Sequence, residues 1–204
     1  MRYKIEYHPT LKDFEDAYII EKNYLEPSTI SSVQQVTSWN NKNKDIHIFV
    51  KDEIKNKVVG EITILPLSET QFTKFMNNEL EDTEINAESL LNYENNKSYY
   101  LLFSAIAIDP EYRDDKTVLS LLLKGINEKL IYLQNKNIKF INMCAEGQTF
   151  EGQRFIENFL DLKYKRKTKD GYKLYAHDDT QDFDNWLEQF PKYIESYNSR
   201  FNLK

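Results

Sequence analysis

Cysteine and histidine are scarce in this chain of 204 residues, and their scarcity excludes several kinds of site. Cys144 is the single cysteine, so an intramolecular disulfide and the four-cysteine zinc patterns are both excluded. The three histidines, His8, His47 and His177, lie far apart and show no spacing typical of metal ligands. We therefore expect no metal site, and we interpret each histidine as structural.

Long apolar runs and an excess of basic residues are also missing. The longest apolar run, from Tyr99 to Ile108, is far shorter than the ~20 residues that a membrane-spanning helix needs. The opening stretch MRYKIEYHPT lacks the apolar core of a secretory signal. The net charge of −6 disfavours binding to nucleic acids or anionic membranes. We expect a soluble, cytoplasmic protein with neither kind of partner.

Hydrophobic and aromatic residues are plentiful, at 40% and 14% of the chain, so one sizeable core is expected. Their periodicity predicts strands over 3–7, 46–50, 58–65, 99–108, 139–144, 163–167 and 172–176. Helices are expected to begin near Thr10, Ser31, Val118 and Phe150. This order predicts an α/β (α+β) fold with a mixed sheet.

The segment 66–98 interrupts this order. Six carboxylates and no Lys or Arg lie between Asn78 and Asn96: Glu79, Glu81, Asp82, Glu84, Glu88 and Glu94. A solvated surface insertion is the ordinary interpretation. The alternative is that the insertion borders a binding site and attracts a cationic substrate.

The tail of the chain has aromatic residues at helical spacing: Phe183, Trp186, Phe190, Tyr197 and Phe201. Pro191 predicts a division into two short helices. Such a stripe is too apolar to remain in water. We therefore expect residues 178–204 to form a helical extension packed on a domain of residues 1–177, in a monomer or a homodimer.

One stretch of the sequence resembles a known family. AIAIDPEYR, followed by a six-residue turn and a long apolar helix, resembles the acetyl-CoA motif of the GNAT acetyltransferase superfamily. The expected strand order from about Tyr3 to Ala176 is similar as well. The resemblance implies a mixed, mostly antiparallel central sheet flanked by helices. It also implies transfer of an acetyl group from acetyl-CoA to a primary amine of a small molecule or peptide.

The resemblance also implies a cofactor site. The backbone of a six-residue turn is expected to bind the pyrophosphate, and the strand before it the pantetheine chain. The matching residues are Arg113, Asp114, Asp115, Lys116, Thr117 and Val118 in the turn, and Ile106, Ala107 and Ile108 in the strand. Arg113 fits the family pattern, whereas Lys116 and Val118 stand where small residues are usual. An alternative is that the aspartates only cap the helix, with no ligand present.

The proton carriers of the family are missing from their usual positions. Leu102 stands at the position of the glutamate base, and Ile156 at that of the tyrosine acid. Substitutes are Glu61 acting through water, Ser104 orienting the thioester or thiol, and Glu146 near the end of a strand. For Glu61, an outward-facing strand carboxylate is the more ordinary interpretation. Tyr164 and Tyr175 are alternatives for the acid.

Two functions therefore remain open at this point. The first is an acyl-CoA-dependent N-acyltransferase. The second is a catalytically degenerate module that binds CoA or a partner without turnover.

Overall fold

The computed structural model describes residues 2–203, and its centre is one seven-stranded sheet of order β1-β2-β3-β4-β5-β7-β6. The strands are β1 (Tyr3–Glu6), β2 (His47–Asp52), β3 (Lys57–Leu67), β4 (Ser98–Ile108), β5 (Lys139–Gly147), β6 (Lys163–Lys167) and β7 (Lys173–Ala176). The β4–β5 pair is parallel, and the other neighbouring pairs are antiparallel. The expected mixed, mostly antiparallel sheet is therefore confirmed.

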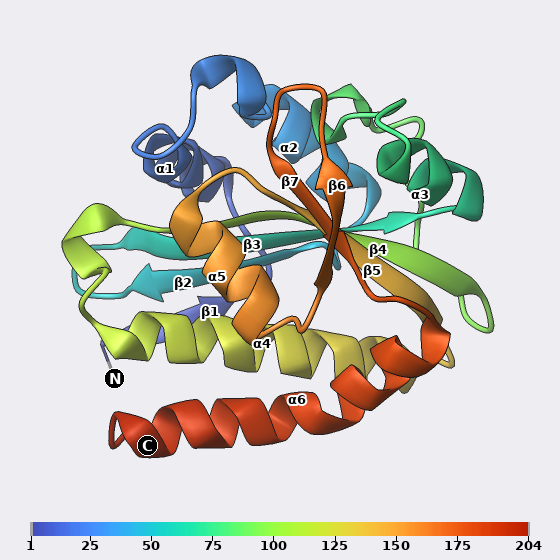
Figure 1. The fold of residues 1–204 in the computed structure, drawn as a ribbon. Coiled ribbons are helices and arrows are strands. Elements are labelled where there is room, and N and C mark those ends of the chain that lie inside the picture. The colour runs from blue at the N-terminus through green and yellow to red at the C-terminus, as the bar shows by residue number, and fades with distance from the viewer. Residues whose placement is uncertain (1, 204) are drawn as a thin grey trace.

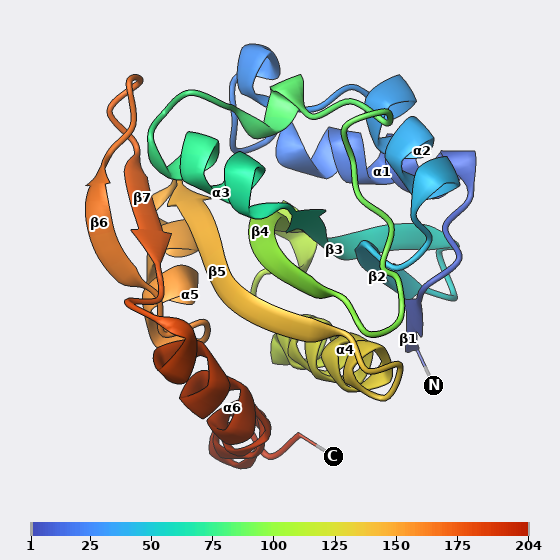
Figure 2. The same ribbon diagram turned by 90° about the vertical axis from the view of Figure 1, so that its right-hand side faces the viewer.

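Helices cover both faces of the sheet (Figures 1 and 2). One face carries α1 (Leu11–Glu21), α2 (Val33–Lys42) and α3 (Glu69–Met76). The other face carries α4 (Lys116–Gln134), α5 (Phe150–Asn158) and α6 (Thr180–Arg200). Within residues 2–203, no helix is both long and apolar enough to cross a membrane.

Helix α4 lies close to the sheet because of two glycines, one in a strand that faces the helix and one in the helix itself. A Cβ atom on Gly60 of β3 would lie 3.0 Å from Val118 Cγ1. A Cβ atom on Gly125 of α4 would lie 2.5 Å from Ile48 Cγ2 of β2. The apolar face of α4 is consequently buried directly against β2 and β3, and its first turn is fixed at the end of β4.

The tail forms one helix, so the prediction of two short helices is wrong. Helix α6 continues through Pro191, although an interior proline costs a helix roughly 3 kcal/mol. Phe183, Trp186 and Phe190 are buried before the proline, and Ile194 is buried after it. Tertiary packing against α4 and β5 holds the residues on both sides of Pro191, so the helix continues through the proline.

The segment 66–98 is also not a simple solvated insertion. It contains α3 and a short 3₁₀ helix, η2 (Asp82–Glu84), and it buries Phe75, Ile85 and Leu90. The indole N–H of Trp39 donates to the Ile85 carbonyl at 2.6 Å, which ties the segment to α2. Its carboxylates are exposed with the exception of Asp82, which is turned toward the sheet.

Candidate active site

The site begins where β4 and β5 separate. Their parallel pairing runs from Ser98 opposite Lys139 to Phe103 opposite Ala145, and β4 continues beyond it without β5. The β3–β4 register shifts at this same point, because Thr63 faces Ala105 while Ile64 faces Phe103. Ser104 therefore has no partner residue in either neighbouring strand. The sheet opens at a residue whose backbone lies outside both ladders.

A cavity of about 670 Å³ includes this opening in its wall. Its wall includes residues of α1, β3, β4 and η2 on one side, and of α4 and α5 on the other. Arg113, Lys116 and Arg154 line the α4–α5 side together with Asp114 and Glu151, which leaves it with a net positive charge, and we call this the basic side. Glu81 and Asp170 are among the carboxylates that line the remainder, and we call the part formed by four others the acidic side: Glu21, Glu61, Asp82 and Glu146.

Most of the residues matched to the cofactor motif reach the cavity. They are Ile106, Ala107, Ile108, Arg113, Asp114 and Lys116. Asp115, Thr117 and Val118 are not part of the wall. Asp115 is the N-cap of α4, where one carboxylate oxygen accepts from the Thr117 N–H at 3.0 Å and the other from the Tyr3 hydroxyl at 2.6 Å. The backbone N–H of Thr117, which a bound anion would use, therefore already donates to the Asp115 side chain.

Tyr24, which follows α1, is a site residue that no sequence motif indicated. Its hydroxyl donates to the backbone carbonyl of Ile108 and accepts from Arg113 Nε at 2.9 Å. The Arg113 guanidinium also lies 4.6 Å from the centre of the Tyr24 ring. Tyr24 thus covers the end of β4 and holds the first residue of the motif against it.

Glu61 differs from the sequence-based interpretation of an outward-facing carboxylate. Its side chain is 4% exposed and lines the cavity, and its Oε1 atom has no hydrogen-bond partner among the described residues. Burial, followed by repulsion from Glu21, raises the pKa of Glu61 well above its usual range. Burial and the charge of Asp82 raise the pKa of Glu21 to about 8.

The other two carboxylates lie at the opening itself. Asp82 accepts a hydrogen bond from the Ser104 hydroxyl at 2.9 Å, and burial raises its pKa although this bond lowers it. Glu146 lies within β5, which extends to Gly147 and not only to Cys144 as predicted. Burial raises the pKa of Glu146 to about 7, close to the value that suits a general base at neutral pH.

The remaining side chains that could carry a proton or act as a nucleophile lie in surroundings that suit a structural role. Tyr175 is fully buried and donates to Glu157 at 2.9 Å, while Tyr164 is exposed, and neither lines the cavity. Burial raises the pKa of the Cys144 thiol. His47 faces the cavity, and burial lowers its pKa to about 3, so its ring is neutral. Between residues 2 and 203, no three His, Cys, Asp or Glu side chains group in a way that could hold a metal ion.

Comparison with solved structures identifies the fold. No protein-family model and no curated protein sequence matches the chain. Among solved structures, the loading GNATL domain of CurA from Lyngbya majuscula is 13% identical, with 88% of this chain and 98% of that chain covered and a TM-score of 0.55. A GNAT-like decarboxylase, GphF, in complex with isobutyryl-CoA is 11% identical, with coverage of 85% and 98% and a TM-score of 0.54.

A third structure is the NatB acetyltransferase complex bound to CoA and MES. It is 9% identical, with coverage of 85% and 95% and a TM-score of 0.53. The three proteins differ in activity as well as in sequence, so what they share with this chain is the arrangement of strands and helices. The resemblance first suggested by the stretch from Ile106 to Arg113 is confirmed at this level: the chain has the fold of the GNAT acetyltransferases.

Proposed function

We propose that the protein is an acyl-CoA-dependent N-acyltransferase that transfers an acetyl group from acetyl-CoA to a primary amine of a small molecule or peptide. The observation that carries this proposal is the opening at Ser104, where the sheet separates inside a cavity that is basic on one side and acidic on the other. An anionic cofactor and a cationic acceptor therefore have separate approaches to one point.

The basic side fits an acyl-CoA. Arg113 and Lys116 stand at the start of α4, whose positive end favours phosphate, and Arg154 faces them from α5. The end of β4, from Ile106 to Ile108, lacks a β5 neighbour and offers backbone groups along the opening. When bound, acetyl-CoA supplies the acetyl group as a thioester.

The acidic side fits an amine that must lose a proton. An alkylammonium ion is not nucleophilic until a base removes its proton. Glu146, with its pKa raised to about 7 by burial, is the carboxylate best matched to that task. Ser104 donates to Asp82, which leaves the hydroxyl oxygen able to accept from the amine. We assign Glu61 to the binding of positive charge, since it lies next to Glu21.

Thermal denaturation with and without acetyl-CoA tests the cofactor half of the proposal. A ligand that binds the folded state raises the melting temperature by mass action. An unchanged melting temperature at millimolar acetyl-CoA would contradict it. Release of free thiol from acetyl-CoA in the presence of a panel of primary amines then tests for turnover.

A catalytically degenerate module is the second candidate, and two contacts favour it. The Asp115 carboxylate occupies the Thr117 N–H, and the Tyr24 hydroxyl occupies the Ile108 carbonyl. Both are backbone groups of the matched motif. Binding of acetyl-CoA without thiol release on any amine would select this second function.

A further inference from the structure

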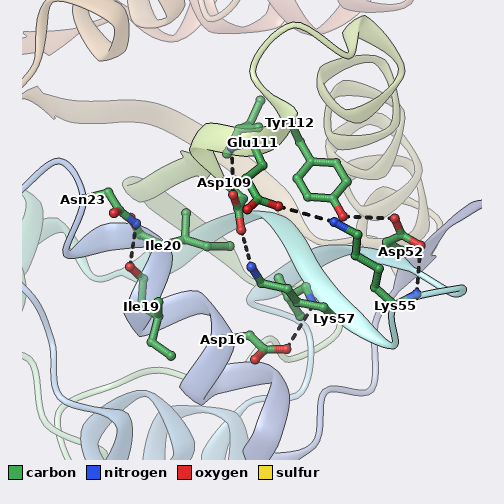
Figure 3. Close-up of polar contacts among 12 residues, drawn as sticks. Asp16, Ile19, Ile20, Asn23, Asp52, Lys55, Lys57, Asp109, Glu111 and Tyr112 are labelled. Carbon is green, nitrogen blue, oxygen red and sulfur yellow. Dashed lines mark hydrogen bonds and ion pairs between the residues drawn. The ribbon is translucent and has the colours of Figure 1, made fainter.

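Buried carboxylates elsewhere in this protein have cationic partners. The ion-pair distance is 2.5 Å between Asp109 Oδ2 and Lys57 Nζ. It is 3.0 Å between Asp52 Oδ2 and Arg2 Nε, and 2.7 Å between Asp13 Oδ1 and Lys51 Nζ. Figure 3 shows Asp109 bonded to Lys57, and Asp52 bonded to the Tyr112 hydroxyl. Burial of a carboxylate is costly unless such a partner is present.

The acidic side of the cavity departs from this rule. Glu61 is as buried as those aspartates, yet neither it nor Glu21, Asp82 or Glu146 forms an ion pair with any residue from 2 to 203. Oε1 of Glu61 has no hydrogen-bond partner at all within that range. A buried polar atom that faces a cavity without a partner indicates that a ligand supplies the missing donor.

The four carboxylates form two groups rather than one point. Asp82 and Glu146 lie at the opening, beside Ser104. Glu61 faces Ala107 on the neighbouring strand, whereas Thr63 faces Ala105. Ala107 lies three residues beyond Ser104, and three residues of strand span about 10 Å, so Glu61 lies roughly that far along the sheet from the opening. Glu21 interacts with both Glu61 and Asp82 and therefore lies between them. Ammonium groups joined by an alkyl chain can bind along such a row of carboxylates.

We propose that the acceptor is an aliphatic diamine or polyamine, with the reacting amine at Ser104, Asp82 and Glu146 and a second ammonium group bound by Glu61 and Glu21. This inference rests on the proposed function for the identity of the reaction. The basic residues that line the cavity are Arg113, Lys116, Arg154 and Lys169, which belong to α4, α5 and the β6–β7 turn or their flanks. None comes from α1, β3 or η2, so the counter-ions that these carboxylates can take up are the ammonium groups of a ligand.

A monoamine leaves one of the two groups without a counter-ion, and this difference is the basis of the test. Isothermal titration of the full chain without any acyl-CoA compares putrescine with butylamine, which has the same four-carbon chain and one ammonium group fewer. Putrescine is expected to bind roughly tenfold to hundredfold more tightly, the effect of one added charged hydrogen bond.

Glu61→Gln retains the shape of the side chain and removes its ability to ionise when a cation binds. This variant is expected to abolish most of the preference for putrescine, and Glu21→Gln provides a second, independent variant of the same group. Glu79→Gln is the matched control, because Glu79 is an exposed carboxylate of the segment 66–98 that does not line the cavity. It is expected to retain the full preference. Equal affinities for the two amines, or a preference that survives both Glu61→Gln and Glu21→Gln, would overturn the inference.

The titration and the turnover assay separate this inference from the proposed function. A preference for putrescine that depends on Glu61, without thiol release from acetyl-CoA, supports the ligand class and refutes the acyltransferase. Equal kcat/KM values for putrescine and butylamine in the thiol assay, with equal affinities, support the acyltransferase and refute the diamine.

Discussion

The Ser104 hydroxyl donates a hydrogen bond to the Asp82 carboxylate at 2.9 Å across 22 positions of sequence. The serine stands where β4 leaves β5 and where its register with β3 shifts, and the aspartate comes from the insertion between β3 and β4. The contact therefore brings an insertion carboxylate to the place where β4 and β5 separate.

This contact gives the first prediction. Ser104→Ala and Asp82→Asn should each lower kcat/KM for the amine by roughly tenfold to hundredfold, because a charged hydrogen bond at the acceptor is lost. Steady-state thiol release measures the effect. Glu84→Gln, an exposed carboxylate of the same 3₁₀ helix, is the control and should match the wild type. If Asp82→Asn behaves like this control, the contact has no part in acceptor recognition.

The second prediction concerns the pH dependence of turnover. Burial raises the pKa of Glu146 to about 7, and the charges of Asp82, Glu81 and Asp170 add to the shift, whereas a hydrogen bond from Gln148 opposes it. A general base must be deprotonated, so kcat/KM should fall as pH decreases below about 7. In Glu146→Gln the rate should be lower and this inflection absent. An inflection that persists unchanged in the variant assigns the base to another group.

A third prediction concerns stability. Burial and then the charge of Asp82 raise the pKa of Glu21 from its ordinary 4.5 to about 8 in the folded chain. Between these values the unfolded state releases a proton that the folded state retains, so stability is lost as pH rises through this window. The melting temperature of Glu21→Gln should therefore exceed that of the wild type by an amount that increases from about pH 5 to about pH 8.

The control for this experiment is Glu15→Gln, an exposed carboxylate of the same helix. Its melting temperature should follow that of the wild type at each pH. A constant difference between Glu21→Gln and the wild type across the window would show that Glu21 titrates normally.

The fourth prediction tests the contact of Tyr24 with the cofactor side. Because the Tyr24 hydroxyl binds the Ile108 carbonyl and Arg113, both must exchange partners before an acyl-CoA uses them. Tyr24→Phe should consequently tighten acetyl-CoA binding by a few-fold, the effect of about 1 kcal/mol for one competing hydrogen bond. Titration calorimetry measures the change. Weaker binding in Tyr24→Phe would instead make the hydroxyl part of the cofactor site.

The fifth prediction concerns the final helix. Trp186 is 1% exposed in α6, and its indole N–H donates to the Phe159 carbonyl at 2.8 Å. Trp186→Ala should lower the free energy of unfolding by about 3–5 kcal/mol. Chemical denaturation provides the measurement, with Glu188→Ala on the exposed face of the same helix as the control. A loss below about 1 kcal/mol would show that α6 is dispensable for the fold.

Sequence periodicity was sufficient to predict the sheet and the helix that follows β4. The alternating and continuous apolar runs specified all seven strands to within a few residues, because burial of one or both strand faces leaves a regular pattern. The stripe of α4 was equally clear. The prediction from Pro191 was wrong, because burial of Trp186, Phe190 and Ile194 on either side of it outweighs the low helix propensity of proline.

The candidate site was only partly accessible from sequence. Short-range motifs indicated the end of β4 and Arg113, since those residues are consecutive in the chain. Glu61, Ser104 and Glu146 were named individually, but nothing in the sequence placed them with Glu21 or Asp82, which come from other elements.

The sequence by itself determined which segments become strands and helices, because local propensity and periodic burial are encoded residue by residue. The tertiary structure alone decided that β4 and β5 separate at Ser104 and that four carboxylates with no cationic partner among residues 2–203 line the resulting cavity. The reason is physical: the pKa of a carboxyl group depends on burial and on charges that approach it through space, and those neighbours are distant along the chain.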